Sequence, residues 1–383
     1  MQLTNFDVER FLRENWQKKP VLIRNAWDSW SNPLEPDELA GLACEAGVES
    51  RLVTRSSDRW ELEQGPLPEI RFGDMGKKPW TLLVQAVDHH VPAVAALLEP
   101  FRFVPNWRVD DVMVSYAVDR GGVGAHFDHY DVFLVQGLGQ RRWQIGARCD
   151  DATPLLPHDD LRLLASFEPT DEWILGPGDI LYVPPGVAHN GIAVGDDCMT
   201  YSIGFRAPSR GELIASWAEH LVDGLNDDDR YSDPGLAMQE NPGEISAQAL
   251  ARLQGMVAES VLDAHAFARW FGEYCTAPKN PEVDWRPEKP IALREVRSLA
   301  AADIPLLRNP ASRFAFIRRE GGALSLSVDG RAYECTGLTA EFAEQLCAQD
   351  HVRIGAPLLG SDEALALIID LLNLGSVAFE PAG

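Results

Sequence analysis

The sequence predicts an α+β multidomain protein, and three observations support this class. The chain has 383 residues, more than one ordinary hydrophobic core accommodates. Short runs of β-branched and aromatic residues recur between glycine and proline turns over residues 100–206, which is typical of a β sandwich or barrel. Helical patterns dominate residues 209–275, and a small α+β unit follows over residues 291–383.

The N-terminal sixty residues combine helix and strand signals. The segment FDVERFLRENW (6–16) has apolar residues at helical spacing, and PVLIRNAW (20–27) is a short apolar strand. The segment SNPLEPDELAGLACEAG (31–47) predicts a capped helix, with Pro36 near its start and Gly47 near its end.

Six segments carry the strand signal of the β-rich region. They are DDVMVSYAV (110–118), YDVFLVQG (130–137), RRWQIG (141–146), EWIL (172–175), GDILYVPP (178–185) and CMTYSIGF (198–205). In a closed or double-sheet β fold, alternate residues of such strands face a lumen.

Two amphipathic helical patterns follow, RGELIASWAEHLVDGL (210–225) and a longer one over residues 246–275. Each has an apolar stripe that must be buried. A second copy of the chain or the β-rich region of the same chain would bury it, and the pattern favours neither. The four prolines of CTAPKNPEVDWRPEKP (275–290) predict a linker.

The C-terminal unit predicts helices with a small hairpin, as in a winged helix. Strands RFAFIRR (313–319) and LSLSVDG (324–330) are separated by EGGA. Helices are expected at TAEFAEQLCAQ (339–349) and SDEALALIIDLLNLG (361–375), followed by the strand SVAFE (376–380). The segment is net acidic, which argues against DNA binding.

Composition limits the partners and the compartment. The formal net charge of −24 repels nucleic acid and attracts basic partners, so either the substrate is a basic protein or the acidity only maintains solubility. No apolar run is long enough for a membrane span, and the N-terminus does not resemble a signal peptide. The six cysteines form no C-x-x-C pair. We therefore expect a cytoplasmic protein without a disulfide framework.

The stretch GAHFDHYDVF (124–133) places two histidines and two aspartates within six positions. His126 and Asp128 are two apart and would point to the same face of an extended strand, whereas His129 and Asp131 have the opposite parity and are assigned away from a metal. Two histidines and one carboxylate form the facial triad of non-haem iron(II) oxygenases, which leaves open positions on the metal. His189, after the strand and Pro-Pro-Gly turn of PGDILYVPPGVAH, supplies the distant histidine. The alternative is a solvated polar loop.

Open positions on such a metal suit a bidentate 2-oxoacid and dioxygen. Arg141, on the strand RRWQIG, could hold a second carboxylate of the co-substrate, whereas Arg142 points to the other face. On the strand DDVMVSYAV, Asp111, Met113 and Ser115 share a face that could line a ligand-containing lumen, where Asp111 would suit a cationic substrate side chain. An ordinary surface arginine and a strand face that meets water are the alternatives.

Several motifs together resemble the JmjC-type iron(II)- and 2-oxoglutarate-dependent oxygenases, and within them the bacterial ribosomal oxygenases that hydroxylate an arginine of a large-subunit ribosomal protein. The specific ones, in this order, are GGVGAHFDHYDVFLVQGLGQRRW, PGDILYVPPGVAH and YSIGFRAP; FLRENWQKKPVLIR, PDELAGLA, SRLV and WTLLVQAV add to them. The resemblance covers nearly the whole chain, and no ligand position departs from it.

The resemblance implies a fold and a set of site residues. The fold is a double-stranded β-helix (jelly-roll or cupin-like JmjC) core over residues 1–207, a helical dimerisation region over 208–276 and a winged-helix-like domain over 277–383. The implied iron ligands are His126, Asp128 and His189. The implied anchors for 2-oxoglutarate are Arg141 and Ser115, and the implied substrate pocket comprises Asp111, Met113, Tyr130 and Ser202.

The expected function is hydroxylation of an arginine Cβ in a basic large-subunit ribosomal protein by a homodimer, with Fe(II) as cofactor and 2-oxoglutarate and dioxygen as co-substrates. We expect no direct nucleic-acid binding and no membrane partner. Two alternatives remain: a histidyl hydroxylase of a ribosomal protein, which an acidic residue at Asp111 disfavours, and a non-catalytic binder of basic ribosomal proteins, which intact ligands disfavour.

Overall fold

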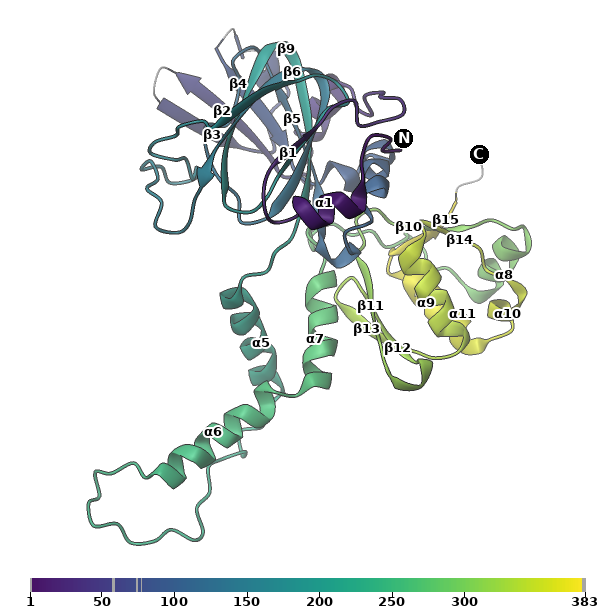
Figure 1. Ribbon diagram of the computed structural model, residues 1–383. Helices are drawn as coiled ribbons and strands as arrows, with labels where there is room; N and C mark the ends of the chain where they lie inside the picture. The colour runs from purple at the N-terminus through teal and green to yellow at the C-terminus, as the bar shows by residue number, and fades with distance from the viewer. Residues whose placement is uncertain (1, 57–58, 74, 77, 381–383) are drawn as a thin grey trace. The chain divides into compact units, whose positions relative to one another are not determined.

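The computed structural model describes residues 2–56, 59–73, 75–76 and 78–380. The chain divides into two compact units. The first comprises Met1–Ala207 with two later segments, Lys279–Arg286 and Asn309–Ala311, and the second comprises Pro208–Pro278, Pro287–Arg308 and Ser312–Gly383. Figure 1 shows the elements of both units.

The first unit is built on one large antiparallel sheet with short helices. Its strands are β1 (Val21–Ile23), β2 (Ser50–Ser56), β3 (Arg59–Gln64), β4 (Trp80–Val84), β5 (Val109–Ala117), β6 (Asp131–Arg148), β7 (Asp171–Leu175), β8 (Ile180–Val183) and β9 (Val187–Phe205). Its helices are α1 (Val8–Glu14), α2 (Pro36–Leu42), α3 (Ile70–Gly73), η1 (Val87–His89), α4 (Pro92–Ala95), η2 (Ala96–Phe101) and η3 (Asn106–Arg108). Among the described residues the strand order is β1-β8-β6-β9-β5-β4-β2-β3, with β7 beside β6.

Two long strands, β6 and β9, form the centre of this sheet. They pair from Asp131↔Phe205 to Arg148↔Val187, with register shifts around Leu138. The first half of β6 also pairs with β8 and its second half with β7. Because the ladder is interrupted midway, the two halves bend away from each other and the sheet curves back on itself, as Figure 1 shows. This curvature produces the predicted double-stranded β-helix.

The hydrophobic core of the first unit contains the apolar face of β5. Val112 and Val114 are fully buried in it, together with Phe133, Tyr182 and Tyr201 from neighbouring strands. This agrees with the alternation predicted for the segment 110–118. The opposite face of β5 is therefore free to line the site described below.

Several details of the first unit differ from the sequence-based expectation. The two segments 130–137 and 141–146 form one continuous strand, β6, since Gly139 takes a positive φ of 58° that keeps the chain in the ladder across the bend. Strands β2, β3 and β4 extend the sheet beyond the six segments that were predicted. The linker 275–290 is also not wholly free, because Lys279–Arg286 belongs to the first compact unit.

The second unit contains helices and two small sheets. Its helices are α5 (Arg210–Gly224), α6 (Ala247–Val261), α7 (Ala264–Thr276), α8 (Leu293–Ala301), η4 (Glu320–Gly322), α9 (Leu338–Ala348), α10 (Ala356–Leu359) and α11 (Asp362–Asn373). Its strands are β10 (Leu306–Arg308), β11 (Phe314–Arg318), β12 (Leu324–Val328), β13 (Arg331–Cys335), β14 (His351–Val352) and β15 (Val377–Phe379). They form the three-stranded sheets β14-β10-β15 and β11-β12-β13.

The helical pattern over residues 246–275 is interrupted. Helix α6 ends at Val261 and α7 begins at Ala264, because the Asp263 side chain accepts hydrogen bonds from the backbone N–H groups of His265 and Ala266 and so caps a new helix. In α5, Trp217 packs against Phe267 and Trp270 of α7. None of the residues of α6 is buried.

Candidate metal centre

Three side chains of the first unit converge on one point. His126, Asp128 and His189 each direct a ligand atom to it, and these atoms all lie within 4.8 Å of one another. The distance from Asp128 Oδ2 to Nε2 is 4.0 Å for His126 and 3.5 Å for His189. Two imidazoles and one carboxylate gathered in this way form the donor set of a facial triad, so the predicted residues fit a divalent iron.

The backbone holds the two histidines together. The N–H of His126 donates to the carbonyl oxygen of His189 at 3.0 Å, and the N–H of His189 donates back at 2.8 Å. His189 belongs to β9, whereas His126 lies in an isolated bridge before β6. The expectation that His126 and Asp128 share one regular strand was therefore wrong. Asp128 lies in the irregular chain after the bridge, where its carbonyl oxygen accepts the N–H of Gly186 at 2.7 Å.

Hydrogen bonds to carbonyl oxygens set the tautomer of both imidazoles. Nδ1 of His126 lies 2.9 Å from the carbonyl oxygen of Gly124, and Nδ1 of His189 lies 3.0 Å from that of Val187. A carbonyl oxygen only accepts, so Nδ1 carries the proton and Nε2 presents its lone pair towards Asp128. Burial and the neighbouring His126 together lower the pKa of His189 to about 4, against the opposing effect of Asp128. His189 is thus neutral at pH 7, as a ligand must be.

The other two polar residues of the motif do not join the centre, as their parity predicted. His129 is exposed and lies 3.7 Å from the carboxylate of Asp151, which is more exposed still. Asp131 is fully buried and accepts hydrogen bonds from Tyr182 (2.6 Å), Gln17 (2.9 Å) and Arg108 (3.1 Å). Asp131 therefore stabilises the fold.

Arg141 is buried with an incomplete set of hydrogen-bond partners. It is only 3% exposed, its Nη2 is 3.5 Å from Ser115 Oγ, and its Nε has no hydrogen-bond partner. Among the described residues, no carboxylate forms an ion pair with it. A buried cation without a counterion is costly. The Arg141 guanidinium can therefore bind an anionic ligand such as the distal carboxylate of 2-oxoglutarate. Arg142, on the opposite face, is partly exposed and lies 3.6 Å from Glu172.

The four predicted pocket residues lie on neighbouring strands or beside the metal ligands. Met113 and Ser202 are cross-strand partners on β5 and β9. Tyr130 lies two positions after Asp128; burial raises its pKa, and the charges of Asp128 and Asp111 raise it further. Asp111 is buried and shares its face of β5 with Met113 and Ser115.

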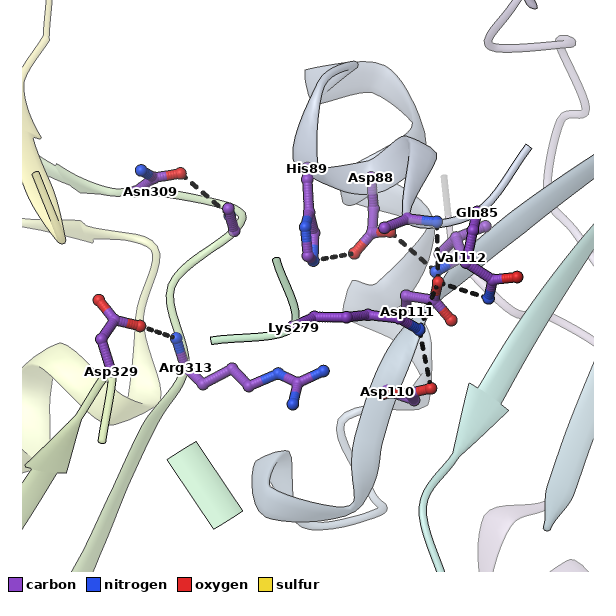
Figure 2. A network of polar contacts seen from close by, with 12 residues as sticks. Gln85, Asp88, His89, Asp110, Asp111, Val112, Lys279, Asn309, Arg313 and Asp329 are labelled. Atoms are coloured by element: carbon purple, nitrogen blue, oxygen red, sulfur yellow. Dashed lines mark hydrogen bonds and ion pairs between the residues drawn. The ribbon is translucent and has the colours of Figure 1, made fainter. Parts of the chain in front are cut away.

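The structure adds partners of Asp111 that sequence reasoning missed. Its Oδ2 accepts hydrogen bonds from Gln85 Nε2 (2.7 Å) and the N–H of Ala86 (2.8 Å), and Lys279 Nζ lies 2.9 Å from the same atom. Figure 2 shows Lys279 extended towards Asp111 and Asp110. No local signal marks Lys279, because it lies in the proline-rich segment that predicts a linker. Only its position, against an acidic strand end, makes it notable.

Comparisons with known proteins agree with this geometry. The family model of the JmjC domain matches residues 96–213, which include all three candidate ligands, and that of the ROXA-like winged helix matches residues 260–378. A third model, of the AraC-like ligand binding domain, matches residues 170–271. The chain is 41% identical over 280 residues to the ribosomal protein uL16 3-hydroxylase of Escherichia coli (strain K12), which covers 73% of this chain and 74% of that protein.

The chain belongs to the ribosomal oxygenase family of JmjC-domain proteins. It is also 42% identical over 258 residues to a protein of Haemophilus influenzae named "Probable ribosomal oxygenase", with 67% of this chain and 61% of that protein covered. The structure of YcfD, a ribosomal oxygenase from Escherichia coli, in complex with cobalt and 2-oxoglutarate has a TM-score of 0.87 and 34% identity to this chain, with 99% of each chain covered. In the part of the chain that the structure describes, no helix is both long and apolar enough to cross a membrane.

Proposed function

We propose that this ribosomal oxygenase is an Fe(II)- and 2-oxoglutarate-dependent enzyme that hydroxylates Cβ of an arginine in uL16, a basic protein of the large ribosomal subunit. The observation that carries the proposal is the gathering of His126, Asp128 and His189 around one point, together with the buried Arg141, which forms no ion pair among the described residues. The relative named for uL16 3-hydroxylation supports the substrate.

In the proposed site, His126, Asp128 and His189 hold the iron and leave its remaining positions open. Arg141, with help from Ser115, binds the distal carboxylate of 2-oxoglutarate. Bound iron supplies the activation of dioxygen, by which one oxygen atom enters the substrate C–H bond and the other enters succinate as carbon dioxide leaves. The protein orients both co-substrates and keeps water away from them.

The proposed substrate pocket comprises Asp111, Met113, Tyr130 and Ser202. Asp111 supplies the negative charge for a guanidinium, a charge-assisted contact. Met113 and Ser202 are cross-strand neighbours, and Tyr130 follows the proposed metal ligand Asp128 by two positions in the sequence. An anionic pocket favours arginine over a neutral histidine side chain.

The test combines metal content, succinate production and the mass of uL16. Wild-type enzyme with Fe(II), 2-oxoglutarate and dioxygen should produce succinate in proportion to added uL16, and one arginine should gain the mass of one oxygen atom. His126→Ala should lose the metal and this activity. His129→Ala, an exposed histidine of the same motif, should keep both. Unmodified uL16 after incubation with the wild-type enzyme would refute the proposed substrate.

The second part of the proposal is a homodimer formed through α5 and α6. Leu250, Leu253, Val257 and Val261 occupy one stripe of α6 and are between 42% and 65% exposed. The described elements of its own unit do not bury this stripe, and another copy of the chain is the solution that we propose. Light scattering should give twice the chain mass for the wild type and a monomer for Leu250→Asp/Val257→Asp. A monomeric wild type would refute the dimer.

We also propose folding units at residues 1–207, 208–276 and 277–383, a cytoplasmic location and no direct nucleic-acid binding. The first compact unit ends its main segment at Ala207 and the second begins at Pro208, which supports the first boundary. The net charge of −24 supports the absence of nucleic-acid binding. Limited proteolysis should cut first near residues 207 and 277, and early cleavage inside the β-sheet core would contradict the division.

A further inference from the structure

Lys279 forms an internal ion pair at the end of β5. Its Nζ lies 2.9 Å from Asp110 Oδ2 and 2.9 Å from Asp111 Oδ2, so one ammonium bridges two consecutive carboxylates. The residue belongs to the segment Lys279–Arg286, which is part of the same compact unit as β5 and contains no helix or strand. Figure 2 shows the lysine side chain reaching the two aspartates from this segment.

The two carboxylates differ in their surroundings. The Asp111 side chain is 3% exposed and its Oδ2 already accepts hydrogen bonds from Gln85 and Ala86, whereas the Asp110 side chain is 32% exposed. Burial alone would lower the pKa of Lys279, but the charges of Asp111 and Asp110 outweigh it and raise that pKa. Lys279 is therefore charged, and it covers the inner carboxylate while remaining in contact with the outer one.

This ion pair lies beside the proposed reaction centre. Asp111 shares its face of β5 with Ser115, four positions later, and Ser115 contacts Arg141. The carboxylate that the proposed function assigns to the substrate guanidinium is thus the one that Lys279 occupies.

We infer that Lys279 is a specificity-determining residue of the substrate pocket: it occupies Asp111 in the resting enzyme, and the guanidinium of the substrate displaces it towards Asp110. The inference rests on the proposed function, and it explains how a pocket with a covered carboxylate selects its substrate. A flexible, strongly hydrated ammonium moves by side-chain rotation alone. A guanidinium is less hydrated and presents several donors in a planar fork, so a substrate arginine displaces the lysine from Asp111. A substrate lysine would exchange one ammonium for another and so would gain no binding free energy.

Two substitutions of Lys279 give opposite expected results. Lys279→Met removes the competing cation and should lower KM for uL16 by about fivefold to tenfold. Lys279→Arg installs a fork that holds both carboxylates and should raise KM. In both variants kcat and KM for 2-oxoglutarate should stay near the wild-type values. If the lysine only stabilised the fold, Lys279→Met would lower activity and stability, whereas Lys279→Arg would keep both. That pattern would overturn the inference.

Asp110 provides a second test, because the displaced ammonium is expected to remain with it. Asp110→Asn should raise KM for uL16 in the presence of Lys279, since the lysine then has only Asp111 as a partner. In the Lys279→Met background the same change should have little effect. Equal effects in both backgrounds would show that the two residues are not coupled and would contradict the exchange.

A labelling experiment tests the exchange without turnover. The reactivity of Lys279 towards acetic anhydride is measured by peptide mass spectrometry in the full-length wild type, with the exposed Lys19 as internal reference. Acetyl-arginine amide should increase the labelling of Lys279 severalfold, and its neutral isostere acetyl-citrulline amide should not. Equal labelling with both probes would overturn the inference. Failure of uL16 hydroxylation with arginine-dependent labelling intact would instead refute the proposed substrate alone.

Discussion

Replacing Arg141 by methionine should separate ligand binding from stability. Arg141 is only 3% exposed; its guanidinium has one long hydrogen bond of 3.5 Å to Ser115, lies 5.8 Å from the centre of the Trp143 ring and leaves Nε without a hydrogen-bond partner. Removing a buried charge that lacks a counterion is neutral or stabilising. The unliganded variant should therefore unfold at the same temperature as the wild type or a higher one.

The substitution should lower the binding free energy for 2-oxoglutarate, although it does not destabilise the unliganded protein. Truncating one partner of a buried, hydrogen-bonded charge pair costs about 2–5 kcal/mol. This corresponds to a dissociation constant for 2-oxoglutarate about 30-fold to several thousandfold higher. At a concentration 100 times the wild-type constant, the ligand stabilises the wild type by about 2.7 kcal/mol and should stabilise the variant by about 0.9 kcal/mol at most.

The assay is thermal unfolding with Co(II) as a redox-inert metal, with and without 2-oxoglutarate. Arg142→Met is the matched control, because this arginine is on the other face of β6 and its side chain is 42% exposed. The control should keep the full ligand-induced shift. An undiminished shift in Arg141→Met would show that another residue anchors the co-substrate, and a large loss of unliganded stability would show that Arg141 is needed for the fold.

Three further results are expected. Asp131→Ala should destabilise the protein by about 3–5 kcal/mol in urea unfolding, because it removes a fully buried carboxylate and leaves the half-buried Arg108 without this partner. Burial raises the pKa of Asp88 from 3.8 to about 7, with Asp111 adding to the shift and Lys279 opposing it, so folding retains a proton that the unfolded chain releases. Stability should fall as pH rises from 3.8 to about 7, and Asp88→Asn should remove this slope; an unchanged slope would exclude Asp88 as its source. Chelation of the metal should lower Tm, and added Co(II) should restore it. A Tm that does not change with the metal would argue against a metal site that binds Co(II) in the folded protein.

Much of the metal centre could be predicted from the sequence because its residues lie in strongly patterned segments. His189 follows a strand and a Pro-Pro-Gly turn, and the alternation of β5 placed Asp111 and Ser115 on the face away from the core. Two histidines and one carboxylate match the donor set of an iron(II) facial triad, and this match indicated a metal-binding role for His126 and Asp128. Local pattern and ligand chemistry together were sufficient for this part.

The remaining features depend on contacts that local patterns do not record. The pairing of β6 with both β7 and β8 depends on contacts between residues far apart in the sequence. Local patterns do not show these contacts, and the sequence therefore predicted two strands where the structure has the single strand β6. The interruption at Asp263 depends on one capping side chain within a continuous apolar periodicity. Lys279 lies where proline content predicts a linker, and its role depends on docking against residues far away in the sequence.

The reciprocal backbone bonds between His126 and His189 have a consequence for biogenesis. During synthesis the first imidazole and the carboxylate leave the ribosome well before the final strand that contributes the other imidazole. A nascent chain that has not yet added β9 has at most two of the three ligands and lacks the bridge that orients them. The complete donor set therefore exists only after β9 has joined the sheet, so we expect stable iron binding to follow completion of the domain.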